Sequence, residues 1–132
     1  MFLNTLTLNQ RKVFLGLANR ILIIDNSVDG AEITHLHRIC AEMSLSLKDG
    51  EEFPLETLKE IFPKEEEKRL VIIELMALAQ SNEEFHEYEK EFIVEVIDAF
   101  GIDSSIIEDI ETLVNEYFSI HKRLESFISG SE

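Results

Sequence analysis

The sequence contains no tryptophan and has only one cysteine, two prolines and five glycines among 132 residues. A single cysteine, Cys40, excludes an intramolecular disulfide and a cysteine-based zinc cluster. So few glycines and prolines cannot supply the turns of an all-β domain of this length. The longest apolar runs, at residues 21–24 and 70–73, are far too short to cross a bilayer. The first six residues lack the pattern of a secretion signal, so we expect a cytoplasmic location.

Basic residues are also scarce. Twelve lysines and arginines stand against 27 acidic residues, and the formal net charge is −15. Nucleic acids and anionic membranes are bound by clustered lysine and arginine, so we expect neither as a partner. Basic proteins and cations fit this charge better. The simpler interpretation is that an acidic surface keeps the chain soluble without any specific partner.

The residues that are present favour an all-α domain. Apolar residues make up 45% of the chain and recur at helical spacing, and no segment alternates with a period of two. A chain of this length fits a single domain over residues 1–132. Thr7 and Gln10 have the spacing of a capping box at a helix start. We predict helices at about 8–24, 30–45, 55–62, 65–79, 87–100 and 104–128. Because Cys40 lies on the apolar face of the second of these, we expect it to be buried by packing.

The chain resembles itself when it is displaced by 57 residues. Apolar positions then coincide, for example Val13 with Leu70, Phe14 with Val71, Ile21 with Leu78, Leu36 with Ile93, Ile39 with Val96 and Met43 with Phe100. Because any two amphipathic helices align to some extent, the shared turn with Val28 and Phe85 is more telling. We predict two helix-turn-helix repeats, at about 8–45 and 64–102, related by a pseudo-twofold axis, with the last helix closing the bundle.

Each repeat has a helix that ends near a polar residue, a short turn with an apolar residue, and a glutamate in the next helix. This arrangement resembles the TerB-like family, named for tellurite-resistance proteins. The match is carried by Asp25, Val28 and Glu32 in the first repeat and by Asn82, Phe85 and Glu89 in the second, where Asn82 replaces the acid. The resemblance covers roughly residues 11–102. It implies an all-α fold of two similar halves, a link to metal or stress resistance, and an acidic metal site rather than an established reaction.

A divalent cation is the sharpest hypothesis for a ligand. The candidate ligands are Asp25, Glu32 and Glu89, with Asn82 and Asp29 as further candidates. If the two turns meet, these residues would present hard oxygen atoms suited to Ca²⁺, Mg²⁺ or Mn²⁺. The first turn opens like an EF-hand loop, but Leu36 occupies the position of the closing glutamate. Helix capping explains Asp29 and Glu32 without a metal, whereas Asp25 opposes the helix dipole and is harder to explain.

No catalytic motif is found in the sequence. It has no G-x-S-x-G, no glycine-rich phosphate loop and no Ser, His and Asp set at a suitable spacing. We therefore expect no catalytic residues. The leading prediction is a non-enzymatic TerB-like interaction or scaffold domain, linked to metal or stress response, with a weak divalent-metal site at its acidic turns. The alternatives are a dedicated divalent-metal sensor or buffer and, third, an enzyme of unknown class.

The last predicted helix carries the longest apolar stripe of the chain, from Ile106 to Ile128 and including His121. Tyr117, Phe118, Phe127 and Ile128 widen the stripe beyond what one core face needs. Burial within the same domain is the usual role of such a face and is the simpler interpretation. His121, on this stripe, is expected to be a core or interface residue. The alternative is a contact with a protein partner or with a second copy in a homodimer.

Overall fold

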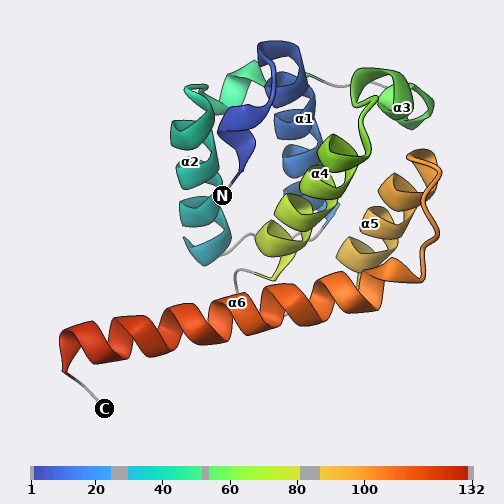
Figure 1. Cartoon of the computed structure of the whole chain (residues 1–132). Coiled ribbons are helices and arrows are strands. Elements are labelled where there is room, and N and C mark those ends of the chain that lie inside the picture. Colours follow the sequence, from blue (N-terminus) through green and yellow to red (C-terminus); the bar gives the residue numbers. More distant parts are fainter. Residues whose placement is uncertain (1, 25–29, 52–53, 81–86, 131–132) are drawn as a thin grey trace.

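Helices form all of the regular structure in the computed structural model, which describes residues 2–24, 30–51, 54–80 and 87–130 (Figure 1). The side chains of residues 22–24, 30–33, 35 and 47 lie outside this description as well. The α-helices are α1 (Leu8–Ile24), α2 (Gly30–Met43), α3 (Leu58–Ile61), α4 (Glu65–Ala79), α5 (Glu87–Ala99) and α6 (Ile106–Ser129). Short 3-10 turns occur at Leu3–Thr5, Leu47–Asp49 and Leu55–Thr57. The all-α prediction is confirmed for the described residues. Among them, no helix is both long and apolar enough to span a membrane.

Hydrogen bonds between nearby residues define where α1 and α4 begin. The Thr7 backbone N–H donates to Gln10 Oε1 at 3.0 Å, and the Gln10 N–H donates to Thr7 Oγ1 at 3.2 Å, which is the predicted capping box. Before α4, the Lys64 backbone N–H donates to Glu67 Oε1 at 3.1 Å. Such bonds satisfy backbone N–H groups that have no acceptor within the helix. The residues near each helix start therefore determine where that helix begins.

The ends of α2 and α5 share one geometry. Ser44 and Gly101 follow these helices with positive φ angles of 58° and 75°. The next residue in each case bonds back over the last turn: the Leu45 N–H donates to the Cys40 carbonyl at 3.0 Å, and the Ile102 N–H donates to the Ile97 carbonyl at 3.2 Å. This left-handed cap satisfies the free carbonyls of a helix end. The two caps therefore lie 57 residues apart.

The helices in the two halves of the chain keep the same spacing. The first residues of α1 and α4 are separated by 57 positions, as are those of α2 and α5. Gln10 and Glu67 occupy corresponding positions and bond directly to each other, because Gln10 Nε2 donates to Glu67 Oε2 at 3.1 Å. A contact between two corresponding residues is expected where a pseudo-twofold axis passes. The turns predicted to meet, at residues 25–29 and 81–86, lie outside the described residues.

The core lies around α1 and α4, which contact each other, while each also contacts α2 and α5. Side chains on the predicted apolar faces are buried, among them Phe14, Ile21, Leu36, Ile39, Leu75, Leu78, Ile93 and Val96. Cys40 is buried as predicted, and this burial raises the pKa of its thiol. A buried thiol of raised pKa is a poor nucleophile, so Cys40 has a packing role.

Candidate functional site

The structure describes the predicted metal ligands only in part. Asp25, Asp29 and Asn82 lie outside the described residues, and Glu32 lies in α2 with its side chain outside the description. Glu89 lies in the first turn of α5 and is completely buried. Within the part of the chain that is described, no three His, Cys, Asp or Glu side chains are grouped so that they could hold a metal ion. The divalent-metal site therefore stays a prediction.

A second carboxylate, that of Glu74 on α4, is also buried, although the sequence did not predict it. Its relative exposure is 1%. Burial raises the pKa of Glu74, and the nearby carboxylate of Glu42 raises it further, while the Phe2 backbone N–H acts in the opposite direction. Glu74 lies 57 residues after Leu17, which is also buried. The correspondence between the two halves could have identified this position as internal.

Replacing Glu74 with glutamine is expected to weaken the pH dependence of stability. The folded state holds the Glu74 proton more tightly than the unfolded chain does, because the folded pKa is raised above 4.5. This group therefore favours folding at low pH, and its contribution is lost as the pH rises from about 4.5 through the raised folded pKa. The melting temperature of Glu74→Gln should fall less over that rise than the melting temperature of the wild type.

Thermal unfolding followed by circular dichroism at several pH values measures this difference. Glu66→Gln, on the exposed surface of the same helix, is the matched control and should keep the wild-type slope. A wild-type slope in Glu74→Gln would contradict the role given to this buried carboxylate.

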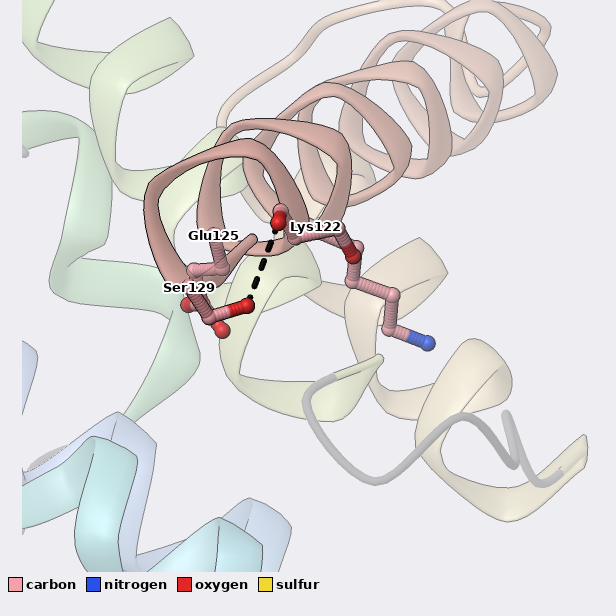
Figure 2. A pocket seen from close by; sticks show the side chains of 4 residues that line it. Lys122, Glu125 and Ser129 are labelled. Carbon is pink, nitrogen blue, oxygen red and sulfur yellow. Dashed lines mark hydrogen bonds between the residues drawn. The ribbon is translucent and has the colours of Figure 1, made fainter. Parts of the chain in front are cut away.

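Two surface hollows each follow a single helix. One is lined by Glu87, Lys90, Glu91, Val94 and Glu95 of α5, and the other by Lys122, Glu125, Ser126 and Ser129 of α6. In the second hollow the Ser129 hydroxyl donates to the Ser126 carbonyl at 3.1 Å, and the Lys122 side chain points away from this bond (Figure 2). Neither hollow places a nucleophile beside a base from another element. The lining residues of these hollows therefore do not form a catalytic arrangement.

Helix α6 is attached to the bundle through its first half. Ile107, Ile110 and Val114 are buried, and α6 contacts α4. Glu111 Oε2 lies 3.6 Å from Lys90 Nζ of α5, and Gln80 Nε2 donates to the Glu111 carbonyl at 3.5 Å. Figure 1 shows that the second half of α6 continues beyond the other helices. Most side chains of this second half are exposed.

A second apolar face of α6 is exposed. Its residues, here called the outer stripe, are Leu113, Tyr117, Ile120, Leu124 and Phe127, with relative exposures of 59%, 41%, 54%, 57% and 77%. They follow one another at intervals of four, three, four and three residues. This spacing is the a and d pattern of a heptad, which lines the seam between two packed helices. Burial within the same domain is therefore correct for Ile107, Ile110 and Val114 and wrong for the outer stripe. Of the other predicted residues, Phe118 is partly buried against the core, whereas Ile128 is 83% exposed.

His121, beside the outer stripe, is also exposed. Its side chain has a relative exposure of 47%, and its Nδ1 atom lies 2.8 Å from Glu125 Oε1 on the next turn. The core interpretation of His121 is therefore wrong, because α6 has left the bundle by this point, and the interface interpretation stays a prediction. The residue instead forms a polar border along the outer stripe.

A scan against family models, a search of curated proteins and a search of solved structures each found no match to this chain. The resemblance to the TerB-like family therefore stays a prediction. Among the described residues, the exposed outer stripe of α6 is the most distinctive surface on which a function can be based.

Proposed function

We propose that this protein is a non-enzymatic interaction module that binds a helix of another polypeptide along the outer stripe of α6. The observation that carries the proposal is the heptad spacing of five large apolar side chains that are 41–77% exposed. A stripe of this kind is the usual docking surface for an amphipathic partner helix. Complete burial of one such side chain contributes roughly 1.5–3 kcal/mol. Five of them can therefore offset a large part of the cost of association.

The attachment of α6 supports this role. Ile107, Ile110 and Val114 hold the first half of the helix on the bundle, and the Glu111–Lys90 ion pair adds a polar contact to α5. At the other end, Gly130 adopts a left-handed φ of 71° that caps the helix. A helix that is formed and oriented before binding loses little conformational entropy when a partner docks.

We further propose that the bundle descends from a duplicated helix-turn-helix unit related to the TerB-like family. The 57-residue spacing of corresponding helices supports this, as do the similar caps at Ser44 and Gly101 and the Gln10–Glu67 hydrogen bond. The weak divalent-metal site at Asp25, Glu32 and Glu89 is part of the same family-based proposal.

Position-dependent photo-crosslinking tests the proposed function in cells that contain the full chain. A photoreactive amino acid at Ile120 or Leu124 is expected to crosslink to one defined helical segment, identified by mass spectrometry. The same group at Thr112 or Ser119, on exposed positions of other faces of α6, should not. Equal crosslinking at all four positions, or none at Ile120 and Leu124, would overturn the proposal.

A charge placed within the outer stripe provides the matched comparison. Ile120→Glu should reduce crosslinking from Leu124 by about tenfold or more, because burying an unpaired carboxylate is costly. Ser119→Glu adds the same charge one residue away, outside the outer stripe, and should leave crosslinking unchanged. At low protein concentration, where no partner is bound, both variants should unfold within about 0.5 kcal/mol of the wild type, since both positions are exposed.

A further inference from the structure

We propose that the helix received by the outer stripe is α6 of a second copy of this chain, docked in the antiparallel direction. This inference rests on the proposed function and names its partner. The heptad spacing requires a partner helix with the same apolar repeat. Helix α6 itself carries this repeat over two heptads, from Leu113 to Phe127. A second copy therefore meets the shape requirement without any other protein.

The charges of α6 are divided along its length, and this division favours an antiparallel pair. Residues 106–116 contain four acidic residues and no base, namely Glu108, Asp109, Glu111 and Glu116. Residues 117–129 contain two bases, Lys122 and Arg123, and one acid, Glu125. The first half is therefore strongly negative and the second half slightly positive, within a chain of net charge −15. In an antiparallel pair, the acidic half of each copy lies beside the basic half of the other.

One antiparallel register pairs four of the five outer-stripe residues with one another. In such a pair, a positions of one helix face d positions of the other. If the twofold axis of the pair passes midway between residues 118 and 119 of each helix, Leu113 faces Leu124 of the second copy and Tyr117 faces its Ile120. Both contacts occur twice by symmetry. Phe127, the most exposed residue of the outer stripe, then lies at the edge of the other bundle, beside the turn that contains the buried Ile110.

The same register brings opposite charges together beside the apolar seam. Glu116 and Arg123 each lie one position before an a residue, at g positions. In antiparallel coiled coils g positions of the two helices are neighbours. Glu116 of each copy then lies beside Arg123 of the other, which gives two complementary contacts.

A parallel pair lacks these advantages. It would place the acidic first turns of both helices, with Glu108 and Asp109, side by side. It would also bring two strongly acidic bundles to the same end of the pair, because each bundle packs on the first half of its own α6. Like charges at this range oppose association. The antiparallel arrangement moves the two bundles to opposite ends.

Charge reversal combined with sedimentation tests this inference on the full chain. The wild type is expected to form a dimer whose dissociation constant rises about tenfold or more in Glu116→Arg or in Arg123→Glu, because each change creates two like-charge contacts. The double variant should restore the dimer, because both contacts are again complementary. A monomer at all concentrations, or a dimer that Ile120→Glu does not weaken, would overturn the inference. So would a double variant no tighter than the single ones.

Disulfide crosslinking tests the direction of the pair. In a Cys40→Ala background, the double variant Leu113→Cys/Leu124→Cys should form a covalent dimer on oxidation, whereas either single variant should not. Crosslinking by a single variant would indicate a parallel pair and would overturn the inference. If the chain is a monomer but Ile120 and Leu124 still crosslink to another protein in cells, the second-copy inference fails while the proposed function stands.

Discussion

Replacing Gly16 with alanine is expected to destabilise the fold by about 1–3 kcal/mol or more. In an open helix the same change would stabilise by about 0.5–1 kcal/mol, because alanine favours helices. The sign reverses here because Gly16, on α1, lies against the backbone of Glu51. An added Cβ would lie 2.9 Å from the Glu51 carbonyl carbon and closer still to its oxygen. The Glu51 N–H donates to the Lys12 carbonyl at 3.1 Å, so this segment is held in place.

Urea denaturation of Gly16→Ala and the wild type measures the difference in the free energy of unfolding. Asn115→Ala, at an exposed position within α6, is the control for helix propensity and should stabilise slightly. If Gly16→Ala were as stable as this control, the close approach of the Glu51 backbone to α1 would not exist in solution.

Phe62→Ala is expected to lower the free energy of unfolding by about 3–5 kcal/mol. Phe62 is completely buried at the end of α3. Its ring meets the ring of Phe100, which follows α5, edge to face, with centroids 6.0 Å apart and an interplanar angle of 87°. Alanine would remove both the buried apolar surface and this aromatic contact, and would leave a cavity between α3 and α5.

Two controls accompany Phe62→Ala in the same denaturation experiment. Phe62→Leu keeps most of the volume and should cost about 1.5 kcal/mol or less. Phe127→Ala is the same substitution at a phenylalanine that is 77% exposed, and at low protein concentration, where the chain is monomeric, it should change stability by about 0.5 kcal/mol or less. Equal losses in Phe62→Ala and Phe127→Ala would contradict the difference in burial.

The helix positions could be predicted from the sequence because they depend on residues close together in the chain. The predicted span of 8–24 for α1 matches Leu8–Ile24, and the Thr7–Gln10 capping box forms as expected. The predicted apolar faces of α2 and α5 are buried at Leu36, Ile39, Ile93 and Val96 among others. Helical periodicity and capping are local properties, so one sequence is sufficient to locate them.

The functional surface could not be predicted in the same way. Periodicity placed Ile110, Val114, Tyr117 and Leu124 on one broad stripe of the last helix, although the first two are buried and the last two are exposed. An apolar residue looks the same in the sequence whether another helix covers it or not. The candidate metal ligands present the same difficulty, because the approach of Asp25 to Glu89 would depend on how two distant turns pack.

The sequence by itself determined an acidic all-α chain, the approximate positions of its helices and many of the side chains that enter the core. These features follow from composition and from interactions within a few residues. Only the tertiary structure decided that Gly16 lies against a backbone segment, that Glu74 is buried, and that the outer stripe of α6 extends past the bundle. Each of these features depends on how elements distant in sequence pack against one another. Burial is a property of the packed helices together and not of any one of them.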